Sequence, residues 1–457
     1  MIQADRIWVG ARVLTMEPGE EIIVDGAVAV KDNRIAGVGT SEALRQTVEA
    51  AEIIDARGKL IMPGLIDAHI HSSYAVIRGV AQDMDHWMQK GIWPWMKYMT
   101  MEDRLAGSYM NIIEGIRAGT TTFADYDRKM DSLLEQNASL GVRFHAAEMI
   151  NELPDDIGDL PVSELYPLDR EAGKRRLLAG TDLYDKWHGA ENGRITVLLG
   201  PQGPDMMSLE LLQQTKAEAD KRGIRLHMHV CQGDRELYQL EKRYGKRSIA
   251  FLEEQGLLNE RLTAVHLTEA DEEETAYAAS KGVNMIHCPG SIGIIDGIVP
   301  PVQAFLEAGG KAAIGTDQAP GNNSSSMFQE IKAAAVLNKV KARDPKVFPA
   351  QQALHMATLG AAEVHGLDHE IGSLRTGKKA DLIVVNLETP ALTPALTKPV
   401  DTITPNLVYA ASGEEVEDVI VDGRFVMKQR KLVHADETAA AQRAQQRAEQ
   451  LARKVKI

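Results

Sequence analysis

The sequence predicts a mixed α/β fold, with a (β/α)8 TIM barrel at residues 63–374 and a small β-sandwich built by the two terminal segments. Two observations predict this fold. Within 63–374, short apolar segments alternate with helical stretches, the pattern of a parallel sheet with helical crossovers. Within 1–62 and 375–433, apolar and polar positions alternate, with turn residues between them. Residues 434–457 are expected to form a C-terminal helix.

The terminal segments contain short strands that we expect to pair in an antiparallel arrangement. The segments are RIWVGARVLTM, EIIVDGAVAVKDNRIAGVG and AEIIDARGKLIM near the N-terminus, and KKADLIVVNLE and VEDVIVDGRFVMKQRKLV near the C-terminus. Because the same alternation of apolar and polar residues appears at both ends of the chain, we expect the two ends to build one β-sandwich together. The tail DETAAAQRAQQRAEQLARKVKI is helix-prone and highly charged, which predicts a surface helix.

The central part contains eight strand candidates. They are PGLIDAHIH, GTTTFADY, RFHAAEMI, TVLLGPQGP, RLHMHVCQ, LTAVHL, VNMIHCPG and AAIGTDQAP. Eight such units suit a (β/α)8 barrel, whose active site lies at the C-terminal ends of the strands. The residues with useful chemistry fall at those ends.

Composition narrows the class of protein. The chain has 457 residues, 44% of them hydrophobic and 25% charged, as expected for a soluble globular protein with one large and one smaller domain. A formal net charge of −14 without a basic stripe argues against nucleic acid and anionic membrane as partners. The sequence has no signal-peptide pattern and no apolar run of about 18 residues. Cys231 and Cys288 lack CxxC spacing, so we expect a reduced, cytoplasmic protein.

Four of the expected strands carry residues that suit a metal ion. His69 and His71 are two residues apart in the first strand, so both side chains lie on the same face. The other candidates are His229 in the fifth strand, His266 in the sixth and Asp317 in the eighth. Imidazole and carboxylate groups are good ligands for divalent transition metals, and metal-activated water is a usable nucleophile near neutral pH. The set therefore predicts an enzyme that acts on a small molecule.

One alternative ligand and two long connections remain open at this stage. His227 shares a strand face with His229 and could compete for the ligand role. The connection at 74–100 holds three tryptophans, and a second long connection covers 151–189. Long loops at the catalytic end of a barrel commonly shape the pocket, so Trp87 and Trp93 are candidates for substrate binding. Aromatic packing or a subunit contact is the alternative for this loop.

The segment PGLIDAHIH, the downstream GTD and the closing GSLRTGKKADLIVV resemble the amidohydrolase superfamily. GTTTFADY, HCPGS and GTDQAPGNN are similar to its mononuclear subgroup, which contains cytosine, guanine and adenosylhomocysteine deaminases and triazine or phenylurea hydrolases. Binuclear members usually carry a carboxylated lysine at the end of the fourth strand. The corresponding TVLLGPQGPD has no lysine, so the resemblance implies one metal ion.

By this resemblance, the imidazole ligands are His69, His71 and His229 and the carboxylate ligand is Asp317. Asp317 would also act as the general base. His266, which stands 21 residues before His287 as is typical of the subgroup, would stabilise developing charge, and His287 is a candidate substrate-binding residue. Zinc is the expected metal, with iron, manganese and cobalt as alternatives. The resemblance also implies a homodimer or larger homo-oligomer.

Three departures from the subgroup bear on the substrate. Deaminating relatives usually have Glu three residues after the strand-five ligand, and this chain has Gln232, whose amide cannot transfer a proton during catalysis. Gln202 replaces a common histidine in the fourth strand and is a candidate substrate-binding residue. After HCP, the sequence GSIGIIDG predicts an apolar wall formed by Ile292, Ile294 and Ile295.

These observations favour a metal-dependent hydrolase that cleaves a C–N bond of a small amide, urea or carbamate. A first alternative is a deaminase or dehalogenating hydrolase of a purine, pyrimidine or triazine, with Asp234, Glu236 or His266 taking over the proton transfer of the missing glutamate. Release of ammonia rather than an amine distinguishes the first alternative. A second alternative is a binding protein on a retired enzyme scaffold, which predicts a lost metal ligand.

Overall fold

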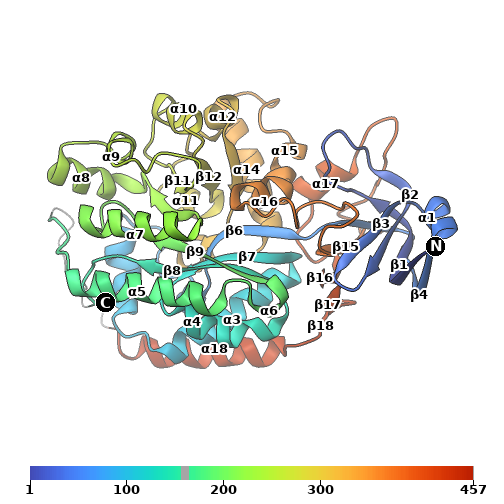
Figure 1. Cartoon of the computed structure of the whole chain (residues 1–457), viewed down its shortest axis with the longest axis horizontal. Helices are drawn as coiled ribbons and strands as arrows, with labels where there is room; N and C mark the ends of the chain where they lie inside the picture. Colours follow the sequence, from blue (N-terminus) through green and yellow to red (C-terminus); the bar gives the residue numbers. More distant parts are fainter. Residues whose placement is uncertain (156–163, 456–457) are drawn as a thin grey trace.

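The computed structural model describes residues 1–155 and 164–455 and contains two β-sheets of nine strands each. Figure 1 shows helices around one sheet in the larger part of the molecule. The blue N-terminal strands and red C-terminal strands of the other sheet lie together at one end.

The first sheet is parallel throughout and runs in the order β13-β12-β11-β10-β9-β8-β7-β6-β14. Its strands are β6 (Leu65–His71), β7 (Thr120–Asp127), β8 (Arg143–Ile150), β9 (Ile195–Pro201), β10 (Leu226–Val230), β11 (Leu262–His266), β12 (Asn284–His287), β13 (Lys311–Ile314) and β14 (Asp317–Gln318). Each of the eight predicted strand segments contributes to this sheet. The prediction of a mixed α/β protein with a parallel sheet is confirmed.

The last predicted strand is divided between the two ends of the strand order. β13 pairs with β12, and β14 pairs with β6, with only Gly315 and Thr316 between β13 and β14. β6, β7 and β8 are buried along their whole length, as expected for strands covered by helices on the outside and side chains on the inside. The polar residues of these strands, among them His69, Asp125, Arg143 and Glu148, are therefore buried together with the apolar ones.

Helices occupy most of the connections between the parallel strands. They are α2 (Trp93–Met96), α3 (Met101–Arg117), α4 (Met130–Asn137), α5 (Arg170–Trp187), α6 (Ala190–Gly193), α7 (Leu209–Arg222), α8 (Gly233–Tyr244), α9 (Ser248–Glu254), α10 (Glu272–Ser280), α11 (Pro289–Ile295) and α12 (Val302–Glu307). After the last strand of this sheet come α13 (Ala319–Asn322), α14 (Met327–Ala342), α15 (Ala350–Met356), α16 (Leu359–His365), α17 (Ile403–Tyr409) and α18 (Glu437–Ala452). No helix within the described ranges is long and apolar enough to cross a bilayer.

The two long connections differ from each other. Residues 74–100 contain part of a 3-10 helix (Ser72–Ile77), a π-helical turn (Met88–Ile92) and α2. The connection predicted at 151–189 is in large part helical, because α5 begins after the N-cap Asp169. Residues 156–163 of this connection lie outside the described part of the chain.

The second sheet unites both ends of the chain. Its strands are β1 (Ile2–Val13), β2 (Ile23–Lys31), β3 (Arg34–Thr40), β4 (Val48–Asp55), β5 (Lys59–Pro63), β15 (Leu382–Asn386), β16 (Val416–Val421), β17 (Arg424–Lys428) and β18 (Lys431–Leu432). The antiparallel prediction is wrong for two pairs, since β1 pairs in parallel with both β4 and β5. The helix α1 (Ser41–Thr47) between β3 and β4 provides the return needed for the first of these pairs.

A buried ion pair joins the two sheets. Arg143, the first residue of β8, donates to both carboxylate oxygens of Asp381, at 2.8 and 3.1 Å. The two side chains are only 5% and 3% exposed. Asp381 directly precedes β15, so this bidentate contact fixes the second sheet against the parallel sheet.

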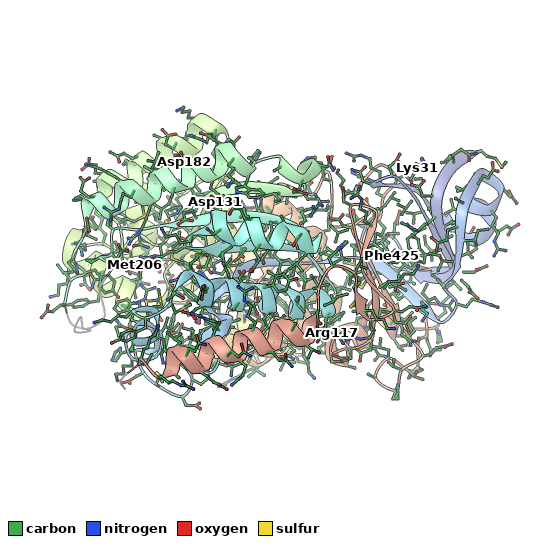
Figure 2. All side chains as sticks on the ribbon, turned by 90° about the horizontal axis from the view of Figure 1, so that it is seen from below. Lys31, Arg117, Asp131, Asp182, Met206 and Phe425 are labelled. Atoms are coloured by element: carbon green, nitrogen blue, oxygen red, sulfur yellow. The ribbon has the colours of Figure 1, made fainter. Side chains whose placement is uncertain are left out.

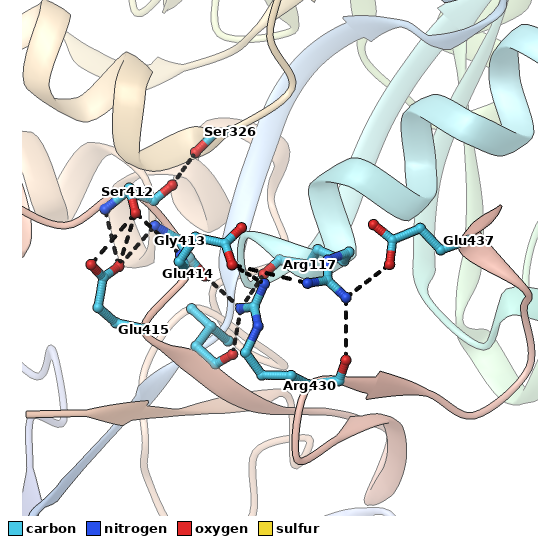
Figure 3. A network of polar contacts seen from close by, with 9 residues as sticks. Arg117, Ser326, Ser412, Gly413, Glu414, Glu415, Arg430 and Glu437 are labelled. Carbon is cyan, nitrogen blue, oxygen red and sulfur yellow. Dashed lines mark hydrogen bonds and ion pairs between the residues drawn. The ribbon is translucent and has the colours of Figure 1, made fainter. Parts of the chain in front are cut away.

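The C-terminal helix α18 lies along the larger part of the molecule beside α3 (Figure 2). At the N-terminal end of α18, Glu437 pairs with Arg117, the last residue of α3. Arg117 also donates to the backbone carbonyl of Arg430 (Figure 3). Arg430 in turn donates to Glu414, at 2.8 Å. Near the other end, Arg447 bonds the carboxylate of Asp103 at 2.7 Å. Residues 456–457 of the predicted helix lie outside the described part.

Candidate active site

Five predicted side chains meet where the parallel strands end. His69 and His71 of β6 have ring centroids 4.7 Å apart. Asp317 Oδ1 lies 3.6 Å from Nε2 of His69 and 3.5 Å from Nε2 of His71. The ring of His229 lies 5.0 Å from that of His69, and His266 lies 5.3 Å from His229. The structure therefore brings together all five residues that the sequence singled out for a metal site.

The backbone near these residues is adapted to this arrangement. A Cβ atom added to Gly315 would lie 2.7 Å from the amide nitrogen and 2.8 Å from the carbonyl oxygen of His69, so only glycine permits this approach of the chain to β6. Asp317 and His266 have φ angles of 61° and 82°, which are uncommon for residues other than glycine. Such conformations often occur at functional sites, where surrounding structure compensates their cost.

The donor set fits a divalent transition metal. One ligand atom from each of His69, His229 and His266 lies within 4.8 Å of the others, and the same holds for His69, His71 and Asp317. All five residues are buried. His69 Nε2 and Asp317 Oδ1 have no hydrogen-bond partner within the described residues. Burying such atoms without a partner is costly, and an ion bound between them would remove that cost.

Three of the histidines, His69, His229 and His266, are held in the form that a metal requires. Burial, with the neighbouring His71 and His229, holds the pKa of His69 well below its usual value. Burial also lowers the pKa of His229 to about 3 and that of His266 well below its ordinary range. Neutral imidazole is the ligating form, so these rings do not need to lose a proton near neutral pH.

Hydrogen bonds behind the five residues orient three of them. His69 Nδ1 lies 2.7 Å from Nε2 of His227, and His229 Nδ1 lies 2.7 Å from the carbonyl oxygen of Gln202. Ser291 donates its hydroxyl to Asp317 Oδ2 at 2.6 Å. His227 thus lies behind His69 and belongs to neither group of candidate ligands in the described chain. Of the two residues that the strand pattern left open, His229 faces the cluster and His227 does not.

Gln232 is held between His266 and an arginine. Its Oε1 accepts a hydrogen bond from Arg235 at 2.7 Å, and its Nε2 lies 3.1 Å from Nε2 of His266. Arg235 is also paired with the buried carboxylate of Asp205. Because an arginine only donates, the amide oxygen of Gln232 must face Arg235 and the NH2 group must face His266. Gln232 therefore donates to the imidazole, which accepts through Nε2.

A cavity opens beside the five residues. Its polar side includes His71, His229, Asp317, Gln202, Gln232 and Gln318. Its apolar side is formed by Tyr74, Trp87, Met88, Ile92, Trp93, Met96, Met149, Leu153 and Pro154. Lys97, Arg104, Arg128 and Asp155 complete the lining. The indole NH of Trp87 donates to Asp296 at 3.0 Å, which ties the 74–100 segment to the end of α11.

Two predicted substrate contacts lie elsewhere. His287 is buried, is 3.4 Å from the side chain of Asn338, and does not line the cavity. The predicted apolar wall is wrong as well. Residues 289–295 form the helix α11, in which Ile292 and Ile295 share one buried face and Ile294 is 45% exposed on another. None of the three isoleucines lines the cavity, and Ile295 borders a neighbouring one.

The two carboxylates considered as substitutes for the missing glutamate are also outside the cavity. Glu236 is buried and accepts hydrogen bonds from the backbone amides of Cys231 and Gln232 and from Ser248. Asp234 borders the neighbouring cavity. Glu236 therefore anchors the start of α8, and neither residue reaches the space beside Asp317.

The sequence interpretation missed the basic residues of the cavity. Arg128 directly follows β7, at the strand end where barrel active sites lie, and this position was a usable signal. Arg104 lies on α3 and reaches the cavity only through the packing of that helix beside Tyr74. No pattern in the sequence indicates this contact.

Comparison with known proteins assigns the chain to a family. The model of the Amidohydrolase family matches residues 60–426, and the chain belongs to this family. It is a hydrolase of C–N bonds other than peptide bonds, and the resemblance seen in the sequence is confirmed.

Curated relatives match over most of their length. The 5'-deoxyadenosine deaminase of Methanosarcina mazei is 35% identical over 99% of both chains. The 5-methylthioadenosine/S-adenosylhomocysteine deaminase of Moorella thermoacetica is 37% identical over 89% of this chain and 90% of its own. A zinc-bound adenosine deaminase of Xanthomonas campestris superposes with a TM-score of 0.89 at 28% identity, over 99% of both chains. Zinc-bound atrazine chlorohydrolase of Arthrobacter aurescens TC1, at a TM-score of 0.83 and 23% identity over 97% and 100%, shares the fold.

Proposed function

We propose that this protein uses one divalent metal ion to hydrolyse the C–N bond of a small amide, urea or carbamate. The observation that carries the proposal is the environment of Gln232. An amide held by Arg235 and His266 stands where deaminating relatives would have a proton-transferring carboxylic acid. Of the described carboxylates, only Asp317 and Asp155 line the cavity, and Asp155 is 73% exposed.

His69, His71, His229 and Asp317 would hold the ion, and the unpartnered buried atoms His69 Nε2 and Asp317 Oδ1 support this assignment. When bound, the ion would lower the pKa of water and polarise a substrate carbonyl. Zinc is the proposed metal, because the solved deaminase and the chlorohydrolase named above both contain zinc. The absence of lysine from β9 supports a single ion.

Asp317 would take the proton of the attacking water, with the Ser291 hydroxyl fixing its other oxygen. His266, oriented by Gln232, would stabilise charge that develops on the substrate oxygen. The proton held by Asp317 can then pass to the leaving nitrogen. An amide or urea nitrogen needs only this one transfer, whereas a ring amine also requires protonation of a ring nitrogen.

A hydrolysis screen of the metal-loaded protein tests the proposal. The panel contains anilides, aryl ureas, carbamates, amino-heterocycles and a chlorotriazine. We expect amine release from the first three classes, measured by chromatography. Ammonia release confined to the amino-heterocycles, or chloride release from the triazine, would contradict it.

The second candidate is an aminohydrolase of a 5'-deoxyadenosine-like nucleoside, favoured by the names of the relatives at 35% and 37% identity. The same screen decides between the two candidates through the released product. A binding protein on a retired enzyme scaffold would have lost a metal-ligating residue. Each of the five expected residues is present in the cluster, which does not favour this alternative.

We further propose that the parallel sheet is a closed (β/α)8 barrel, as the pairing of β14 with β6 supports. The proposed domains are residues 63–374 for the barrel, 1–62 with 375–433 for the second sheet, and 434–457 for the final helix. A cytoplasmic homo-oligomer is proposed as well, and the two buried, unpaired cysteines are consistent with a reducing compartment. Light scattering of the purified protein measures the oligomeric state.

A further inference from the structure

Two arginines line the same cavity as the candidate metal ligands. Arg104 lies on α3 and Arg128 directly follows β7, and both border the space that also contains His71 and Asp317. Their side chains are only 10% and 20% exposed. Guanidinium groups this deep in a protein normally have carboxylate partners, so their pairing is informative.

Within the described residues, the nearby carboxylates do not saturate these guanidinium groups. Arg104 contacts Ser73 Oγ at 3.2 Å and Asp127 at 3.5 Å, both through the same terminal nitrogen. Arg128 contacts Asn151 Oδ1 at 3.3 Å and Asp155 at 3.5 Å, and its buried Nε has no partner within the described residues. These are long contacts for charge-assisted bonds, which are commonly 2.7–2.9 Å.

A third arginine competes for the same acid. Arg176 lies 2.5 Å from Asp155 and also donates to the backbone of Asn151 and Leu153. Three cationic side chains therefore share the carboxylates of Asp127 and Asp155. Burial, followed by repulsion from Arg176, lowers the pKa of Arg128 to about 10, as expected for a cation with too little compensating charge.

The ring of Tyr74 lies between Arg104, at the basic end of the cavity, and His71 of the candidate metal ligands. The ring of Tyr74 lies 5.8 Å from that of His71, and the guanidinium of Arg104 lies 5.6 Å from the centre of the same ring. Met149, Leu153 and Trp93 also line this cavity. A ligand that reaches from the cluster to the arginines would therefore contact apolar side chains along its middle.

We propose that Arg128 and Arg104 form a carboxylate-binding subsite, so that the substrate is an organic acid with an apolar body. Its carboxylate would accept hydrogen bonds from both guanidinium groups, while its C–N bond lies at His71 and Asp317. The position of the scissile bond rests on the proposed function. The carboxylate subsite rests on the arginine geometry alone.

Binding is measured first, without turnover. Isothermal titration of the metal-loaded protein compares 3-phenylpropionate with 3-phenylpropanol, a neutral molecule of similar shape. We expect tighter binding of the carboxylate by roughly 10- to 100-fold, the range of a charge-assisted hydrogen bond in a partly buried site. The preference should weaken as salt concentration rises. Equal affinity for the acid and the alcohol overturns the subsite.

The variant Arg128→Met removes the charge and keeps an apolar side chain. It should lose most of the preference for the acid, whereas Arg128→Lys should keep part of it and the exposed Arg45→Met should keep all of it. Undiminished binding of the acid to Arg128→Met places the carboxylate elsewhere, for example on the metal, and overturns the proposal. If Arg128→Met fails to fold, as judged by thermal unfolding, the preference of Arg128→Lys for the acid over the alcohol is compared with that of the wild type. An unchanged preference in Arg128→Lys then overturns the proposal.

Turnover separates this inference from the proposed function. An anilide that carries a carboxylate on its acyl chain is compared with its methyl ester. The ratio of their kcat/KM values should fall by roughly tenfold or more in Arg128→Met. Hydrolysis of both without any preference for the acid supports the proposed function and overturns the subsite. Arg128-dependent binding of acids without any C–N hydrolysis supports the subsite and contradicts the proposed function.

Discussion

Nδ1 of His69 lies 2.7 Å from Nε2 of His227, although the two residues belong to different strands, β6 and β10. Nε2 of His69 faces Asp317, so a ring that ligates through Nε2 carries its proton on Nδ1 and donates it to His227. A hydrogen bond of this kind fixes both the tautomer and the ring orientation of a metal ligand.

The first prediction concerns this hydrogen bond. His227→Phe should lower metal affinity by roughly 10- to 100-fold, the range found when a partner of a ligating histidine is lost. His227→Asn retains an acceptor oxygen and should recover part of the affinity. Competition with a chromophoric chelator measures it, and the exposed His369→Phe is the control. Unchanged metal affinity in His227→Phe would show that the hydrogen bond has no orienting role.

The second prediction concerns the ligands themselves. His69→Ala or His71→Ala removes an imidazole from the cluster and should abolish both tight metal binding and hydrolysis. Metal content after dialysis, measured by plasma mass spectrometry, is the readout. Stoichiometric, tightly bound metal in the double variant is incompatible with the proposed site.

The third prediction concerns proton transfer. Asp317→Asn keeps the shape of the side chain and its acceptor oxygen for Ser291, but it removes the base. Hydrolysis should fall by roughly 100-fold or more, the contribution of a positioned general base. Metal content must be measured in parallel, because Asp317 is also a proposed ligand. Near-normal turnover with normal metal content would exclude Asp317 as the base.

The fourth prediction concerns stability. Arg143→Met leaves the carboxylate of Asp381 buried without its bidentate partner, which should cost about 3–5 kcal/mol of the free energy of unfolding. Denaturant unfolding followed by tryptophan fluorescence measures the loss. The double variant Arg143→Met/Asp381→Leu should recover part of it, because the carboxylate of Asp381 is no longer buried without its partner, while Asp422 keeps its pair with Lys379. Arg57→Ala, which removes a partner from an exposed pair with Asp55, should have little effect.

The sequence predicted those parts of the site that follow from strand periodicity. His69 and His71 share a strand face, and strand ends in a barrel meet, so the cluster could be expected from the amino-acid pattern alone. The prediction of an apolar wall was wrong because the residues after β12 form a helix rather than an extended segment. The sequence could not decide whether His227 or His229 faces the cluster. Strand periodicity indicates which face of the strand a side chain lies on, but not its distance from the other ligands.

The arginine subsite could not be predicted for a different reason. Arg104 and Arg128 come from a helix and from a strand end, and they meet only because α3 packs beside Tyr74. A sequence does not encode that juxtaposition in any local spacing. The same holds for Arg143 and Asp381, which are 238 residues apart.

The last prediction concerns Gln232→Glu. The new carboxylate would lie beside Arg235, which now donates to Oε1 of Gln232 at 2.7 Å, and that cation should lower the pKa of the introduced acid. Activity on amino-heterocycles, measured as ammonia release, should therefore rise most at acidic pH, where more of the carboxyl group is protonated. Hydrolysis of amides and ureas should fall near neutral pH, because the ionised carboxylate cannot donate to Nε2 of His266 as the amide does. The exposed Gln445→Glu is the matched control. If neither activity changes, Gln232 does not take part in the reaction, and the explanation of substrate choice through this residue is wrong.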